Sequence, residues 1–146
     1  MTAQREEDEA AIRRQIGKIG EGLRDKDLEG LEQLYAADIV SFDVEPPLQH
    51  VGTAAKLKNW VNVFTFFEKV RYEIRDLKLT VDDEVAFGHG FGRLGGTLKN
   101  GTETSGMWVR ATFCFRKIGG TWLIAHDQVS VPFDITSGRG VADLEP

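Results

Sequence analysis

The chain contains one cysteine, Cys114, and four prolines among its 146 residues. A single cysteine excludes an internal disulfide and a cysteine-based zinc site, and it is typical of proteins from the reducing cytoplasm. No segment approaches the roughly 20 consecutive apolar residues that a membrane-spanning helix needs. Residues 1–14 are polar and acidic, unlike a secretory signal peptide. These absences predict a cytoplasmic protein with no membrane span.

Clusters of lysine and arginine are also missing, and the formal net charge is −5. Nucleic acids and anionic membranes bind basic surfaces, so neither is an expected partner. Hydrophobic residues make up 41% of the chain and charged residues 28%, which is ordinary for a folded globular protein. At this length we expect one domain over residues 1–146, with residues 133–146 as a C-terminal tail.

Apolar residues with helical spacing predict three helices in the first half of the chain. The first covers residues 8–23, and the second begins after Asp27, which is placed to cap it. A third follows Gly52-Thr53, and its predicted buried stripe is Leu57, Trp60, Val61 and Phe64. A short strand at residues 39–43 is expected between the second helix and the Pro46-Pro47 turn.

Beyond Phe67 the apolar residues alternate, which predicts four long strands at residues 70–81, 84–94, 103–116 and 121–131. Within the first of these strands the apolar positions change parity between Ile74 and Leu77. Such a change indicates a β-bulge, and bulges bend sheets. Because helices precede antiparallel strands, the predicted class is α+β.

Three segments are informative about family: Asp27-Leu28-Glu29-Gly30-Leu31, Gly52-Thr53-Ala54-Ala55, and the ending from Gly120 to Pro132. Together with the order of elements, they resemble the NTF2-like superfamily and, within it, the SnoaL-like and ketosteroid-isomerase-homologue branch. The resemblance implies a cone in which three N-terminal helices pack on a strongly bent antiparallel sheet. It also implies a homodimer through the outer sheet face that carries Trp108 and Arg110. It implies no single reaction, because the superfamily hosts many functions.

Period-two alternation sorts the strand residues into two faces, and the resemblance assigns one set to the inside of the cone. That set is Val85, Phe87, His89, Phe91 and Arg93, then Met107, Val109, Ala111, Phe113 and Phe115, then Trp122, Ile124, His126 and Gln128. Such a pocket suits a small hydrophobic molecule as partner. We expect that molecule to contact Trp60, Phe64, Phe91, Phe113 and Gln128.

Asp43, at the end of the short strand, matches the general base of the ketosteroid isomerases. The alternative is a structural carboxylate that binds the amides of the following turn. On the same alignment, the two hydrogen-bond donors of the isomerases are replaced by Ile19 and Ala111. Because one missing donor of this kind typically costs a few kcal/mol of transition-state stabilisation, we do not expect steroid isomerisation by that mechanism.

His89 and His126 replace apolar wall positions of the isomerases. A neutral imidazole can hold or transfer a proton near neutral pH, so both are candidate catalytic groups beside Asp43. The alternative for each is a hydrogen-bonded core histidine. No third nitrogen or carboxylate has a recognisable ligand spacing, so we expect no metal site and no cofactor. His50, after the Pro46-Pro47 turn, is expected to be exposed at the entrance.

These features predict a small enzyme that works by acid–base chemistry, of the isomerase, dehydratase or cyclase type. Its substrate would be a hydrophobic compound with a carbonyl or hydroxyl group, and Asp43 with His126 would be the leading pair. The alternative is a non-catalytic ligand-binding or assembly domain that uses the cone for stability. The sequence does not name the substrate, and it leaves open whether the protein is an enzyme.

Overall fold

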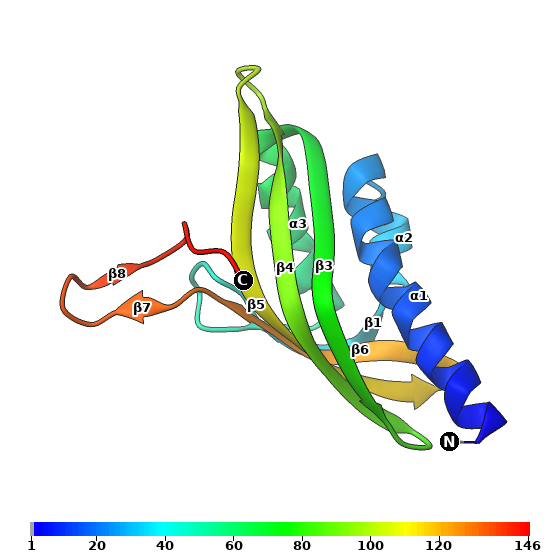
Figure 1. Ribbon diagram of the computed structural model, residues 1–146. Coiled ribbons are helices and arrows are strands. Elements are labelled where there is room, and N and C mark those ends of the chain that lie inside the picture. Colours follow the sequence, from blue (N-terminus) through cyan, green and yellow to red (C-terminus); the bar gives the residue numbers. More distant parts are fainter. Residues whose placement is uncertain (1) are drawn as a thin grey trace.

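The computed structural model describes residues 2–146 as three helices and eight strands (Figure 1). The helices are α1 (Ala3–Asp25), α2 (Leu28–Glu32) and α3 (Thr53–Phe66). The strands are β1 (Tyr35–Phe42), β2 (His50–Val51), β3 (Phe67–Val81), β4 (Val85–Leu98), β5 (Glu103–Ile118), β6 (Thr121–Ser130), β7 (Phe133–Asp134) and β8 (Arg139–Gly140). The helices and long strands follow the predicted order, whereas the sequence does not predict β2, β7 or β8. No helix in residues 2–146 is both long and apolar enough to cross a membrane.

Six strands form one sheet in the order β2-β1-β6-β5-β4-β3, and β7 and β8 form a separate hairpin. The four long strands pair antiparallel, as predicted. β1 pairs parallel with β6, so the sheet is mixed rather than antiparallel throughout. The sheet is strongly curved and the helices cover its inner face, which confirms the α+β class and the cone (Figure 1).

The predicted β-bulge is present in β3. Its register with β4 shifts between Arg75 and Lys78, and Asp76 has a left-handed φ of 57°. The extra residue reverses the alternation, so apolar side chains pack toward the core from both halves of the strand. The inward residues are Val70, Tyr72 and Ile74 before the bulge and Leu77 and Leu79 after it.

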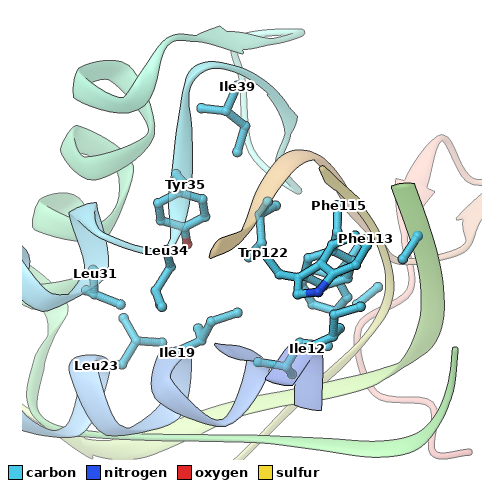
Figure 2. Packing of buried hydrophobic residues seen from close by; sticks show 14 of the residues in the cluster. Ile12, Ile19, Leu23, Leu31, Leu34, Tyr35, Ile39, Phe113, Phe115 and Trp122 are labelled. Atoms are coloured by element: carbon cyan, nitrogen blue, oxygen red, sulfur yellow. The ribbon is translucent and has the colours of Figure 1, made fainter. Parts of the chain in front are cut away.

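Helix α1 packs across the hydrophobic core of the cone (Figure 2). Its buried face presents Ile12 to aromatic side chains of β5 and β6, whereas Leu23 lies near Leu31 of α2. Two polar contacts fix the register: the Trp122 indole donates to Asp8 at 3.1 Å, and the Gln15 amide donates to the Trp122 carbonyl at 2.8 Å. These buried bonds hold α1 on β6.

The inner face of β4 is the opposite of the one predicted. Ala86, Gly88, Gly90 and Gly92 face the core, whereas Val85, Phe87, His89, Phe91 and Arg93 face outward. Side chains of β3 explain the difference, because they lean across β4: a Cβ added at Gly88 would lie only 2.5 Å from the Leu79 side chain. Positions 88, 90 and 92 leave no room for a side chain, and an apolar pattern cannot reveal a face made largely of glycines.

A second bulge reverses the faces of β6. Cys114 pairs with His126 but Phe115 pairs with Ile124, which leaves Ala125 as an extra residue. Before the bulge, Ile124 is buried as predicted. After it, Asp127 turns inward and His126 outward, so the predicted inward positions of His126 and Gln128 are wrong. β5 has the predicted faces, with Val109, Ala111, Phe113 and Phe115 buried.

Helix α3 packs most of its predicted stripe against the core, but Val61 is replaced on the buried face by Lys56. Val61 is 40% exposed, whereas Lys56 is only 2% exposed. Leu57, Trp60 and Phe64 pack against the core as expected. A fully buried lysine is rare unless its charge is paired, so its position marks a polar site inside the apolar cone.

Candidate functional site

A cluster of polar side chains lies at the end of β1, between α3 and β6. Its members, here called the Lys56 cluster, are Ser41, Asp43, His50, Lys56, Asn59 and Asp127. Strand pairing assembles it, since Ser41 is paired with Asp127 of β6 on one side and with His50 of β2 on the other. Residues 41–59 therefore meet the distant Asp127 at one point.

Lys56 is the centre of this cluster. Its ammonium nitrogen lies 2.8 Å from Asp43 Oδ1, 3.2 Å from Asp127 Oδ2 and 3.0 Å from Ser41 Oγ. Three contacts match the three hydrogens of an ammonium group. Burial alone would lower the pKa of Lys56, but the nearby charges of Asp127 and Asp43 outweigh it and raise that pKa. Lys56 is therefore a cation at neutral pH.

The Asp43 carboxylate points into the cone and is only 6% exposed. Its Oδ1 contacts Lys56, and its Oδ2 accepts a hydrogen bond from the Asn59 amide at 3.0 Å. The structure gives it no bond to the amides of the turn at Pro46-Pro47, among residues 2–146. The inward placement matches the predicted position of a base, and the turn-binding alternative is not what the geometry shows.

His50 is the member of the cluster with an unsatisfied atom. Its Nε2 is buried and forms no hydrogen bond within residues 2–146. That nitrogen lies 3.3 Å from Asp43 Oδ2, close enough for an ion pair but at angles outside hydrogen-bond geometry. The side chain is 13% exposed, so the expectation of an exposed entrance residue is wrong. Pairing of the short strand β2 with β1 turns it inward.

Asp127 is the second buried carboxylate. One of its oxygens accepts a hydrogen bond from the Ser41 hydroxyl and the other contacts Lys56. Two carboxylates thus share one ammonium ion. The bulge at Ala125 is what turns this side chain toward Lys56.

Two phenols lie near the cluster. The hydroxyl of Tyr35 accepts a hydrogen bond from the Trp60 indole at 3.0 Å, and the Lys56 nitrogen lies 5.9 Å from the centroid of the Tyr35 ring. Burial raises the pKa of Tyr35 to about 12. Burial also raises the pKa of Tyr72, and the charges of Lys56, Asp127 and Asp43 act on both phenols. Both groups therefore stay protonated at neutral pH.

A groove of about 790 Å³ borders the cluster where β1 and β6 end. Its walls are largely apolar side chains from the loop of residues 42–49, the end of β6 and the β7–β8 hairpin, and they include Leu48, Val131 and Phe133. Within residues 2–146, Asp43 is the one charged residue that lines it, and Gln49, Gln128 and Ser130 are the other polar ones. The groove therefore gives an apolar molecule access to a single carboxylate.

The structure separates the predicted site residues into two groups. Asp43, Trp60, Phe64 and Phe113 contribute to the cone interior. His89, His126 and Phe91 lie on the outer face of the sheet, and Gln128, although outward, lines the groove. His126 there packs edge-on against Phe42 and its Nδ1 lies 2.6 Å from the Val40 carbonyl. Asp43 and His126 therefore do not face a common cavity.

Sequence reasoning missed Lys56, Asp127 and His50. The burial of Lys56 is predictable, because this residue lies four residues before Trp60 and eight before Phe64, on the same side of the helix. The inward direction of Asp127 is not predictable, because it depends on the bulge in β6. As for a metal site, residues 2–146 contain no group of three histidine, cysteine, aspartate or glutamate side chains that could hold an ion.

A family model described as SnoaL-like domain matches residues 12–134. Among solved structures, an NTF2-like protein of unknown function from Pseudomonas putida is 30% identical, with a TM-score of 0.84, over 100% of this chain and 99% of that one. No curated protein matches.

More distant structures share the fold. An NTF2-like superfamily protein from Salmonella enterica is 17% identical over 89% of this chain and 94% of that chain, with a TM-score of 0.74. A type-2 hexachlorocyclohexane dehydrochlorinase is also 17% identical, over 86% and 85% of the two chains, with a TM-score of 0.74. At such identities the likeness concerns the fold alone.

Proposed function

The chain belongs to the SnoaL-like domain family of the NTF2-like superfamily, and we propose that it is an acid–base enzyme acting on a hydrophobic compound with a carbonyl or hydroxyl group. One observation carries the proposal. The carboxylate of Asp43 is nearly buried and is fixed by Lys56 and Asn59, and Asp43 is the one charged residue along the groove in the part of the chain that the structure describes. A positioned carboxylate beside an apolar binding surface is the arrangement that proton abstraction from carbon needs.

In this proposal Asp43 removes a proton from the carbon next to the substrate carbonyl. The electron pair of the broken C–H bond forms a carbon–carbon double bond, and the carbonyl oxygen takes the negative charge. Asp43 then returns the proton to another carbon, as in an isomerase. In a dehydratase, Asp43 would give the proton to a β-hydroxyl group instead, and this group leaves as water while the enolate electrons form the new carbon–carbon double bond and the carbonyl is restored. The dehydrochlorinase that shares the fold is consistent with elimination chemistry of this kind.

Lys56 and Asp127 surround the base. The Lys56 ammonium ion holds the Asp43 carboxylate in place. Asp127 takes a share of the same charge, so Asp43 is not fully neutralised by its partner. The cluster has two carboxylates around the ammonium ion of Lys56. Because the protein has one thiol, we place this reaction in the cytoplasm.

The experiment begins with native mass spectrometry of the purified protein, to find a retained small molecule. That compound is then incubated with the unmutated protein, with Asp43→Asn and with His126→Ala. We expect Asp43→Asn to keep binding and lose conversion at least 100-fold. His126→Ala is the matched control, because His126 lies on the outer face, and it should convert the compound normally.

Failure of the unmutated protein to convert any compound it binds would overturn the enzyme proposal. It would favour the alternative, a non-catalytic ligand-binding or assembly domain. Equal conversion by Asp43→Asn and the unmutated protein would remove Asp43 as the base.

A further inference from the structure

We propose that the groove beside Asp43 selects uncharged substrates with a second neutral polar group, and that Gln49 and Gln128 bind this group. The inference rests on the proposed function and names the substrate class of the same site. It starts from the polar wall of the groove, since Asp43, Gln49 and Gln128 line one cavity and can contact one ligand. A polar group left without a partner under a bound molecule costs affinity, so each amide bears on which molecule binds.

Strand pairing places the two glutamines on either side of Phe42. Gln128 of β6 is paired with Phe42 in the parallel register. On the other side, Ser41 pairs with His50 of β2, so Gln49 comes next to Phe42. Neighbouring strands lie about 4.8 Å apart, which puts the backbones of the two glutamines roughly 10 Å from each other. A molecule that lies over Phe42 is therefore within reach of both amides.

The Phe42 ring forms the part of the groove wall between the two amides. It is 40% exposed and packs edge-on against His126, with the ring centroids 4.7 Å apart. Asp43 follows Phe42 directly in the chain, and one strand residue advances the backbone by about 3.3 Å. A substrate that rests on this ring has one part near the Asp43 carboxylate and another part between the glutamines.

Both amides have unused hydrogen-bonding capacity. Within residues 2–146 the structure gives neither the Gln49 nor the Gln128 side chain a hydrogen bond. A side-chain amide has two N–H donors and one carbonyl acceptor and carries no charge, so it pairs well with a ketone, an ester, an amide or a hydroxyl. Ser130, two residues beyond Gln128, also lines the groove, and its oxygen accepts a hydrogen bond from Arg110 at 3.1 Å.

The charges around the groove favour a neutral molecule over an anion. In the described part of the chain the cavity has one charged lining residue, Asp43. Its partner Lys56 is only 2% exposed, so the ammonium group does not reach a ligand in the groove. Arg110 contacts the wall at Ser130 and Val131 but does not line the cavity. An anion would therefore lie beside a carboxylate with no cation within reach, and this costs affinity at a site largely screened from water.

The apolar walls orient such a molecule. Leu48 in the loop of residues 42–49 is 95% exposed, and Phe133 of β7 is 64% exposed. A bound molecule that covers these two side chains removes apolar surface from water, which favours binding. The substrate class is therefore an uncharged molecule with an apolar edge toward the loop and hairpin and a polar edge toward the two glutamines.

The test compares three probes that share one ring system. 2-Naphthamide is neutral and polar, 2-naphthoate is an anion, and 2-isopropenylnaphthalene has the same outline but no hydrogen-bonding group. Equilibrium dialysis against the full-length protein measures the affinity for each probe. We expect 2-naphthamide to bind at least tenfold more tightly than either of the other two.

Variants assign the selectivity to named side chains. Gln49→Leu and Gln128→Leu should each bind 2-naphthamide about fivefold more weakly, because one neutral hydrogen bond is lost, and 2-isopropenylnaphthalene at least as tightly as before. Gln33→Leu is the matched control, since Gln33 is exposed at the end of α2 and does not line the groove, and it should change neither affinity. Asp43→Asn should strengthen the binding of 2-naphthoate at least tenfold by removing the opposing charge. Circular dichroism verifies that each variant is folded, and Gln128→Met takes the place of Gln128→Leu if that variant unfolds.

Binding of 2-naphthoate by the unmutated protein as tight as that of 2-naphthamide would overturn the charge selectivity. A preference for the amide that survives in the double variant Gln49→Leu/Gln128→Leu would remove the two glutamines from the proposal, and failure of all three probes to bind would overturn it as a whole. Because these measurements do not depend on turnover, they are distinct from the test of the proposed function. Selective binding without conversion of any compound would contradict the enzyme proposal and leave the selectivity of the groove standing. Conversion that depends on Asp43, without selectivity among the probes, would do the reverse.

Discussion

The ammonium nitrogen of Lys56 lies 2.8 Å from Oδ1 of Asp43, and this contact joins α3 to the end of β1 inside the cone. A buried ion pair of this kind contributes little net stability, because desolvation offsets most of the attraction. Removing one partner is costly, however, since it leaves the other charge buried and unpaired. The pair is therefore better explained as a device for positioning Asp43 than as a source of stability.

The first prediction is that Lys56→Met destabilises the fold by about 3–5 kcal/mol, because two buried carboxylates lose their cation. Urea unfolding measured by circular dichroism gives the free energy. Lys58→Met is the control, since Lys58 is exposed two residues away, and it should change stability by less than about 0.5 kcal/mol. Adding Asp127→Asn to Lys56→Met should recover part of the loss. Equal stability of the Lys56 and Lys58 variants would show that the charges are not buried as described.

The second prediction concerns alkaline stability. The pKa of Tyr35 is raised by burial from 10.0 to about 12, so the folded state holds the phenol proton more tightly than the unfolded chain does. The associated stability, on the order of 3 kcal/mol, is complete below pH 10 and is lost as pH rises through about 12. The raised pKa of Lys56 acts in the same direction above 10.5. Urea midpoints between pH 9 and pH 12 should fall, and less steeply in Tyr35→Phe; parallel curves for the two proteins would contradict the assignment.

The third prediction tests the bulge in β3. Asp76 has a φ of 57°, which a β-branched residue tolerates poorly, so Asp76→Val should cost about 1–2 kcal/mol. Asp76→Gly should be close to neutral, because glycine adopts this conformation freely. Lys78→Val, two residues on and also exposed, is the control and should not destabilise a strand. If the valine variants at residues 76 and 78 are equally stable, the bulge is elsewhere.

The fourth prediction concerns assembly, where we propose a homodimer through the outer face of the sheet. Trp108 on this face has two guanidinium groups over its ring, with Arg75 at 4.6 Å and Arg93 at 5.4 Å from the ring centroid. Truncation of an interface tryptophan often costs about 2 kcal/mol or more, so Trp108→Ala should weaken the dimer at least about 30-fold in sedimentation equilibrium. Leu48→Ala, at the groove, is the control. A monomeric unmutated protein at micromolar concentration would rule the dimer out.

The sequence predicts well those features of the fold that depend on neighbouring residues, such as helix caps and bulges within an apolar pattern. The Asp27 side chain accepts a hydrogen bond from the Gly30 amide at 3.0 Å, as its position before Leu28 indicates. The bulge in β3 is predictable from the sequence, because the apolar residues before it and those after it occupy alternate positions of opposite parity. The position of Asp43 came from resemblance rather than from pattern, and the structure places it inward as expected.

The rest of the site depends on information that no local pattern contains. Asp127 faces Lys56 only because Ala125 is an extra residue relative to β5. The residues around Ala125 do not indicate a bulge. The outward turn of His89 follows from the glycines of β4, which make room for side chains of another strand. His50 turns inward through a two-residue strand that is too short to show a period. Each of these depends on pairing between distant segments.

The extra residue in β6 also bears on how this scaffold can change over evolutionary time. Loss of Ala125 would leave Ile124, His126 and Asp127 opposite their present partners in β5, and so on the same faces. A register in which Ala125 itself paired with Cys114 would instead bring His126 into the cone and turn Asp127 outward, without any substitution. The carboxylate beside Lys56 would then be replaced by an imidazole, and the cluster would have one carboxylate for its one lysine. Relatives with the same residues in this strand can therefore differ in reactivity, and an alignment that ignores the bulge would compare the wrong positions.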